Sequence, residues 1–337
     1  MIHSIGKGAA MTEYIPCQPQ GDEAHPDYRL RARGEFSRIG WACFAMMALA
    51  QGGALLLMLL CQFLAMAGSR GMIAFLQSEW FQWVITDLAN YGLGLPVLLL
   101  MLRRVPKQPS AGRKRVTAKQ FGALALVSYA VVYLTNLLGL AVNSGISALR
   151  GEQAGDLLSG MVSGSNPWLV FLFGVVLAPL LEEWVFRDIL LRRLSAWGEG
   201  LAIFGSAFLF GLFHGNLGQF FYAFAVGAVF AYVALRTGGI RYTVLLHFLV
   251  NLLGMTVSQA VVDADNPVLT ALFGWCLLAV VAAGTVILWR HRKKVRLRCG
   301  GLPLTEPEKR RLFLGSSGVI AMIVLSAAMM LYVAFWY

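Results

Sequence analysis

The residues best suited to chemistry interrupt one of the most apolar runs of the chain. Glu182, Glu183 and Arg187 lie within six residues of each other, in the segment that begins at Pro167. A charged side chain near the centre of a bilayer costs roughly 2.5–3.5 kcal/mol on insertion scales, so a purely structural role for three charges would be expensive. We therefore interpret this segment as part of an active site.

Two of the five histidines also lie in apolar sequence. His214 ends the run Phe210 to His214, and His247 begins the run His247 to Asn251. The four-residue spacing puts His247 and Asn251 on one face of a helix. A single histidine or asparagine inside a membrane is more often a hydrogen-bond partner in helix packing, but six such residues on three helices favour a site.

Helical spacing separates the roles of the two glutamates. Glu183 and Arg187 are four residues apart and can pair, whereas Glu182 is turned by about 100° around the helix. We expect the pair to orient the site and Glu182 to carry the chemistry. Pro179 leaves the Val175 carbonyl without its usual donor, so we expect a kink that admits water.

A carboxylate and an imidazole that converge in a pocket can deprotonate water and direct it at a carbonyl carbon. A second imidazole and an amide, here His247 and Asn251, can stabilise the oxyanion that develops. These parts suffice for peptide hydrolysis without a serine or cysteine nucleophile.

Composition places these residues in a membrane protein. Of the 337 residues, 58% are hydrophobic, 13% are charged and 36 are glycine, which is too apolar for a soluble enzyme of this length. The sequence predicts an all-α polytopic transmembrane bundle of about eight or nine spans, with a four-helix catalytic core. The nine candidate spans are about 41 to 67, 82 to 102, 121 to 142, 167 to 191, 201 to 217, 219 to 235, 242 to 261, 267 to 289 and 313 to 336.

The spans divide the chain into four parts. Residues 1–38 are expected to be a flexible cytoplasmic tail, and 39–166 to be accessory spans 1 to 3 with their loops. Residues 167–261 are the expected catalytic core, because their spans have short connections and hold most of the polar chemistry. Residues 262–337 form the C-terminal spans.

The net charge of +11 comes from loops rather than from one folded face, which argues against a nucleic-acid partner. With a cytoplasmic N-terminus, 26 of the 28 Lys and Arg residues lie inside, and only Arg70 and Arg150 lie outside. We expect a multi-pass protein of the cell membrane with its C-terminus outside. The lipid bilayer is thus an expected partner.

Depth along the spans gives one inconsistency. Glu182 and His247 lie roughly 14 and 8 Å from the cytoplasmic ends of their spans, whereas His214 lies about 20 Å deep. We therefore expect either a short or re-entrant helix at 201 to 217 or span boundaries wrong by a turn. Asp87, near the outer end of the second span, is interpreted as an interfacial carboxylate rather than a functional one.

The polar residues resemble three motifs of the CAAX protease and bacteriocin-processing (CPBP, or Abi) intramembrane proteases, which are related to the type II CAAX prenyl endopeptidases. Residues 182 to 187 resemble EExxxR, 210 to 214 resemble FxxxH, and 247 to 251 resemble HxxxN, in the family's order. The resemblance covers roughly 167 to 261.

The resemblance implies an intramembrane endopeptidase in which Glu182 and His214 activate water and His247 with Asn251 hold the oxyanion. This family is commonly labelled metalloprotease, and Glu182, His214 and His247 would be the zinc ligands if zinc is used. The sequence lacks HExxH, and a metal-free glutamate mechanism uses the same residues. We expect the metal to be optional.

The expected substrate is a membrane-associated peptide or protein, such as a CAAX-type C-terminus, a bacteriocin or signal-peptide leader, or another membrane protein. The main alternative is a proton- or ion-coupled transporter that uses the same buried cluster. Transporters usually contain an internal repeat, and no second half mirrors residues 182 to 251. A catalytically silent peptide-binding scaffold is a further alternative.

Overall fold

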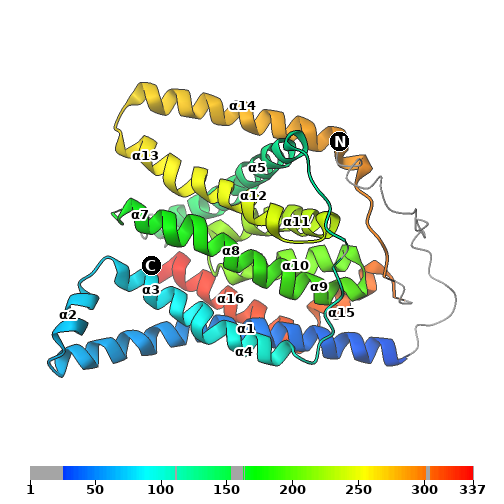
Figure 1. Cartoon of the computed structure of the whole chain (residues 1–337), viewed down its shortest axis with the longest axis horizontal. Coiled ribbons are helices and arrows are strands. Elements are labelled where there is room, and N and C mark those ends of the chain that lie inside the picture. Colours follow the sequence, from blue (N-terminus) through cyan, green and yellow to red (C-terminus); the bar gives the residue numbers. More distant parts are fainter. Residues whose placement is uncertain (1–25, 111, 153–161, 163, 301–303, 337) are drawn as a thin grey trace.

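A computed structural model of the chain describes residues 26–110, 112–152, 162, 164–300 and 304–336, which fold almost entirely into helices (Figure 1). Helices labelled α are α-helical, and those labelled η are π-helical except the short 3-10 helices η5 and η7. The elements are α1 (Pro26–Met66), α2 (Arg70–Leu76), α3 (Trp80–Asp87), η2 (Leu88–Gly94), α4 (Leu95–Leu102), α5 (Ala118–Arg150), α7 (Pro167–Leu169), η3 (Val170–Leu177), α8 (Ala178–Glu183), η4 (Trp184–Leu190), α9 (Leu191–Leu194), η5 (Ser195–Trp197), α10 (Glu199–Phe213), α11 (Leu217–Thr237), α12 (Arg241–Asn251), η6 (Leu252–Val257), α13 (Ser258–Asp263), α14 (Pro267–His291), η7 (Arg292–Lys294), α15 (Glu306–Leu314) and α16 (Ser317–Trp336).

The predicted all-α polytopic architecture is confirmed. Within the described residues, eight helical segments are long and apolar enough to cross a membrane. They are Asp27–Met66, Trp80–Leu102, Ala118–Arg150, Pro167–Trp197, Leu217–Thr237, Arg241–Asp263, Pro267–Lys294 and Ser317–Trp336.

The ninth expected span, 201 to 217, is the short helix α10. Its 15 residues cover about 22 Å, less than the roughly 30 Å of a hydrocarbon core. The chain reverses after it, since His214 caps α10, Gly215 has φ +57° and Asn216 caps α11. The short-helix alternative therefore holds, and it places His214 at the tip of a helical hairpin inside the bundle.

Helix α1 begins within the segment that was expected to be a flexible tail. Residues 1–25 lie outside the described part of the chain, but α1 begins at Pro26 rather than near residue 39. The reason is a buried stripe within polar sequence: Ala32, Phe36 and Ile39 are fully buried. The Phe36 ring packs edge-on against Trp197 at 5.2 Å and Phe313 at 5.6 Å.

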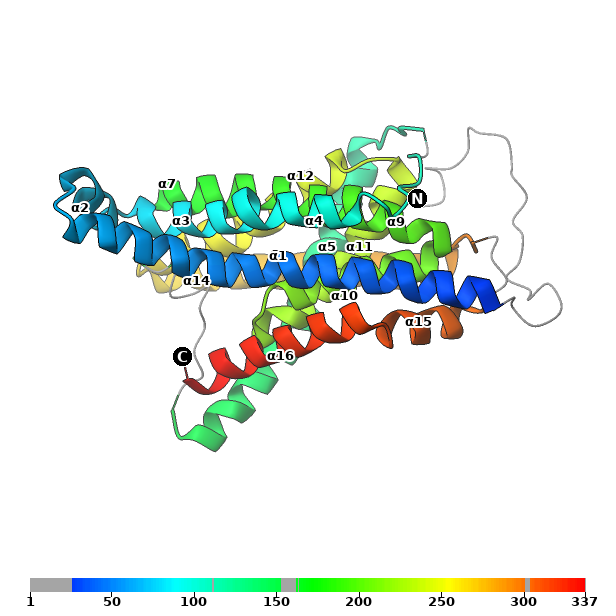
Figure 2. The ribbon, with the colours of Figure 1, turned by 90° about the horizontal axis from the view of Figure 1, so that it is seen from below.

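Helix α1 packs between the α3–α4 segment and α16 (Figure 2). Its crossing with α16 is very close, because a Cβ atom at Gly40 would lie 2.1 Å from the Val319 backbone nitrogen. On the other side of the bundle, α5 packs against α11 and α14. The site lies between these two groups of helices.

Helix α5 extends two turns beyond the expected end near residue 142. It runs to Arg150 and ends at Gly151, whose φ of +74° is the left-handed conformation that commonly stops a helix. Ser147 stays inside the helix by donating its hydroxyl to the Asn143 carbonyl. The expected outer loop therefore begins at 151, and its residues 153–161 and 163 lie outside the described part of the chain.

In the described part of the chain, four π-helical stretches interrupt the spans. η3 and η4 flank the short helix α8 that carries Glu182 and Glu183, and η6 follows Asn251 directly. A π-helical turn widens the hydrogen-bond ladder to i→i+5 and changes the direction of the side chains that follow it. The site is thus built where three of these distortions meet.

Candidate active site

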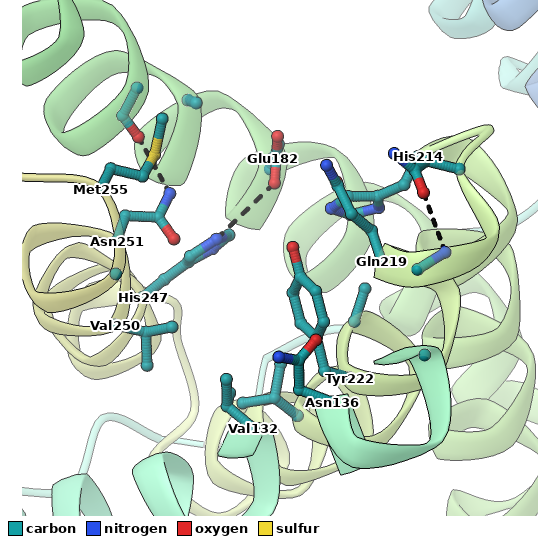
Figure 3. A pocket seen from close by; sticks show the side chains of 18 of the residues that line it. Val132, Asn136, Glu182, His214, Gln219, Tyr222, His247, Val250, Asn251 and Met255 are labelled. Carbon is teal, nitrogen blue, oxygen red and sulfur yellow. Dashed lines mark hydrogen bonds and ion pairs between the residues drawn. The ribbon is translucent and has the colours of Figure 1, made fainter. Parts of the chain in front are cut away.

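Four of the six predicted site residues line one cavity of about 640 Å³. Glu182 comes from α8, His214 from the end of α10, and His247 and Asn251 from α12. Figure 3 shows these four side chains around the open space of the pocket. Glu183 and Arg187 do not line it and are buried behind it.

The two glutamates lie in different surroundings, and the expected pair of Glu183 with Arg187 is present. The Arg187 Nε atom lies 3.3 Å from Glu183 Oε2, and both side chains are fully buried. The Glu182 side chain is 21% exposed and faces the cavity. One carboxylate therefore belongs to the interior ion pair, while the neighbouring one is available to a ligand.

His247 joins the two glutamates. Its Nδ1 atom lies 3.1 Å from Glu183 Oε1, and its Nε2 atom lies 3.7 Å from Glu182 Oε2. Arg187, Glu183 and His247 thus form a continuous polar chain from the protein interior to the cavity wall. The sequence predicted the Arg187 pair but not the link to His247, because no local spacing relates residues 64 positions apart.

Phe210 has a structural role in its motif. The Arg187 guanidinium lies over the Phe210 ring at 4.2 Å from the centroid, a favourable cation–π geometry. The same ring contacts His214 edge-on at 4.8 Å and His247 at 5.9 Å. Gly227 of α11 leaves room for the pair, since its Cβ atom would lie 3.1 Å from Phe210 and 3.2 Å from Arg187.

The His214 ring is held by its own helix. Its Nδ1 atom lies 2.8 Å from the carbonyl oxygen of Phe210, and a carbonyl can only accept, so Nδ1 carries the proton. In the neutral ring the other nitrogen, Nε2, is then an acceptor. His214 therefore presents a lone pair at the cavity and can hold a water molecule by its hydrogen.

Asn251 satisfies the carbonyl that Pro179 leaves unpaired. In η3 the ladder is i→i+5, as shown by the Ala178 amide donating to Phe173, so the next carbonyl due a donor is Gly174 rather than the predicted Val175. Pro179 has no N–H to give. The Asn251 amide donates to the Gly174 carbonyl at 2.9 Å and takes its place. The hydrogen bond that Pro179 leaves open, where a kink was expected to admit water, is thus made by Asn251.

The three predicted zinc ligands, Glu182, His214 and His247, line the same cavity, and their use of zinc stays a prediction. Among the described residues, no group of three or more His, Cys, Asp or Glu side chains is placed to hold a metal ion. His247 is held through Nδ1 by Glu183, and His214 is held through Nδ1 by the Phe210 carbonyl, so that Nε2 of each ring would be the atom to hold a metal.

Several cavity residues were missed or interpreted otherwise from the sequence. Asp87, expected at the membrane interface, lines the cavity and interacts electrostatically with Glu182. Tyr91 from the same span, Asn136 from α5, and Gln219 and Tyr222 from α11 also line it. The sequence feature that could have indicated them is the recurrence of polar residues within apolar spans. This feature alone does not show which face of each helix lines the site.

The described residues thus form an all-α bundle of membrane-spanning length, with a glutamate, two histidines and an asparagine around one cavity. Residues 164–253 match the family model described as type II CAAX prenyl endopeptidase Rce1-like. This match confirms the resemblance carried by the three motifs, all of which lie inside it. It does not favour the transporter alternative. No curated protein and no solved structure matches the chain.

Proposed function

We propose that this protein is an intramembrane endopeptidase that hydrolyses a peptide bond in a membrane-associated peptide or protein. The observation that carries the proposal is the convergence of Glu182, His214, His247 and Asn251, from three separate helices, on one cavity. The family match over residues 164–253 supports the same class of reaction.

In the proposed mechanism, Glu182 is the general base. A water molecule held between the Glu182 carboxylate and His214 Nε2 gives one proton to Glu182 while its oxygen attacks the carbonyl carbon of the scissile bond. The carbonyl π electrons move to the oxygen and form a tetrahedral oxyanion. As that intermediate collapses, the C–N bond breaks and Glu182 returns the proton to the leaving amine.

The oxyanion is stabilised by donors on α12. When both ring nitrogens of His247 are protonated, Nδ1 donates to Glu183 and Nε2 donates toward the cavity. The Asn251 amide has a second N–H besides the one given to Gly174. Fixed donors in a site of low dielectric stabilise a developing negative charge without reorganising. Glu183 and Arg187 keep the His247 ring in place.

The test uses purified protein in proteoliposomes with a fluorogenic farnesylated peptide ending in a CAAX sequence, and with an unprenylated leader-type peptide. Cleavage of either supports the proposal, and the preferred one indicates the substrate class. Glu182→Ala and His214→Ala are expected to abolish cleavage while the protein keeps its thermal unfolding temperature in detergent. Full cleavage by both variants contradicts the assignment.

The metal requirement is proposed to be optional, because the glutamate and the histidines can activate water directly. Element analysis of active protein together with a chelator titration tests this. Full activity with less than stoichiometric metal supports the metal-free mechanism, and loss of activity that added zinc restores contradicts it.

The proposed location is the cell membrane, with the N-terminus in the cytoplasm and the C-terminus outside. The asymmetry of Lys and Arg supports this orientation. Reporter tags fused before Met1 and after Tyr337 test it in intact cells. An external N-terminal tag would contradict the orientation.

A further inference from the structure

Helix α5 presents a polar face to the cavity, although it lies outside the segment that matches the protease family. Tyr129, Asn136 and Asn143 recur every seven residues and all line the pocket. Residues seven apart are nearly two full turns apart, so the three side chains share one face. The proposed mechanism uses none of them.

Two contacts fix the position of this face relative to the catalytic residues. The Tyr129 hydroxyl donates to the Leu249 carbonyl at 2.8 Å, which ties α5 to the helix that carries His247 and Asn251. Further along, a Cβ atom at Gly139 would lie 2.4 Å from the Gly218 carbonyl oxygen, so α5 and α11 nearly touch there. Asn136 lies between these two contacts.

The close approach at Gly139 also brings a second helix into this wall. Gln219 follows Gly218 on α11 and lines the same cavity. Within the described residues, the side-chain amides of Asn136 and Gln219 have no hydrogen-bond partner in the protein, and both residues are partly exposed. In Figure 3, Asn136 and Glu182 lie on opposite sides of the pocket. An occupant of the cavity would therefore meet Glu182 on one side and Asn136 on the other.

The spacing of the α5 amides suits one kind of ligand. A primary amide offers a donor and an acceptor, as a peptide group does. Asn136 and Asn143 are about 10.5 Å apart along the helix axis at 1.5 Å per residue. An extended peptide rises about 3.3 Å per residue, so it covers this distance in about three residues.

We propose that Asn136 and Asn143 of α5, with Gln219 of α11, bind the main chain of the substrate and hold it extended across the catalytic residues. The substrate is then an unfolded polypeptide segment recognised by its peptide groups, with broad tolerance for its side chains. This inference rests on the proposed peptidase function and specifies the substrate of that same cavity. The three amides are positioning residues and take no part in proton transfer.

The experiment measures binding and cleavage separately. The probe is a fluorescein-labelled farnesylated dodecapeptide ending in a CAAX sequence, together with analogues in which single backbone amides are replaced by esters. Binding is measured in the Glu182→Gln background, and cleavage is measured with Glu182 intact. Asn136→Leu and Asn143→Leu remove the amides at nearly constant volume. Ser144→Leu, at an exposed α5 position that does not line the cavity, is the matched control.

Asn136→Leu and Asn143→Leu are each expected to weaken peptide binding about tenfold and to raise KM with kcat within about threefold, whereas Ser144→Leu changes neither. One ester analogue should bind more weakly than the parent peptide to the protein with Asn136 intact. The same analogue and the parent peptide should bind equally well to the Asn136→Leu protein. Unchanged binding in both leucine variants overturns the inference. So does an equal loss of affinity for farnesyl-cysteine methyl ester, because the amides would then recognise the lipid group.

The two hypotheses fail differently. If Glu182→Gln abolishes cleavage while both leucine variants behave like the unsubstituted protein, the peptidase function is supported and peptide binding by the three amides is contradicted. If Glu182→Gln cleaves normally, the proposed mechanism fails, and the KM values of the leucine variants with Glu182 intact still decide whether the amides bind a peptide.

Discussion

The Nδ1 atom of His247 lies 3.1 Å from Oε1 of Glu183, a fully buried carboxylate that also pairs with Arg187. This relationship makes Glu183 the link between the buried Arg187 guanidinium and the His247 imidazole at the cavity. Removing one member of a buried ion pair leaves the other charge without compensation, at a typical cost of about 3–5 kcal/mol.

We therefore predict that Glu183→Gln destabilises the protein by about that amount and lowers activity, because His247 also loses its orienting acceptor. The measurement is unfolding in detergent, with Asp188→Asn as the control. Asp188 pairs with Lys107 and Arg192 but is partly exposed, so its loss should cost about 1 kcal/mol or less. Equal losses in the two variants would contradict the buried-pair account. The double variant Glu183→Gln, Arg187→Met should be more stable than Glu183→Gln alone and should remain inactive.

The hydrogen bond from Asn251 to Gly174 predicts a coupling between Asn251 and Pro179. Asn251→Leu leaves the Gly174 carbonyl unpaired, which costs about 1–3 kcal/mol. Pro179→Ala supplies an N–H that can reach this carbonyl in the i→i+5 ladder. We expect Asn251→Leu to be clearly less destabilising in the Pro179→Ala background. A double-mutant cycle in thermal unfolding measures this. Additive losses of stability would show that Asn251 does not replace the N–H donor that Pro179 lacks.

The close approach of α5 and α11 predicts a contrast between two glycines of one helix. A Cβ atom at Gly139 would lie 2.4 Å from the Gly218 carbonyl, whereas one at Gly145 would meet nothing within 4 Å. Gly139→Ala should therefore cost about 1–3 kcal/mol by overpacking and reduce activity by displacing the α5 wall. Gly145→Ala should be neutral or stabilising by up to about 1 kcal/mol, since alanine favours helix. Similar unfolding temperatures for both variants would argue against this helix contact.

Much of the architecture follows from the sequence because apolar length and charge asymmetry are local signals. The spans, the three motifs and the Glu183–Arg187 pair each depend on residues close together in the chain. The start of α1 was misplaced because Phe36 is buried against Trp197 and Phe313, which are distant in sequence. Nothing near residue 36 indicates that partner.

The remaining features depend on tertiary geometry. Whether Pro179 leaves Val175 or Gly174 unpaired is decided by a π-helical turn, which the local sequence does not specify. The depth of His214 depends on where α10 ends. Asp87 and Asn136 look like isolated polar residues in their spans, and only helix packing brings them to the cavity of Glu182.

The central claim is that Glu182 transfers the proton of the attacking water, and Glu182→Gln tests it most directly. The amide keeps the size and hydrogen bonding of the carboxylate but cannot act as a base. In proteoliposomes, single-turnover cleavage of the farnesylated peptide should fall about 10³-fold, in the range expected for loss of a general base, with peptide affinity within about twofold. Cleavage at the rate of the unsubstituted protein would contradict the account.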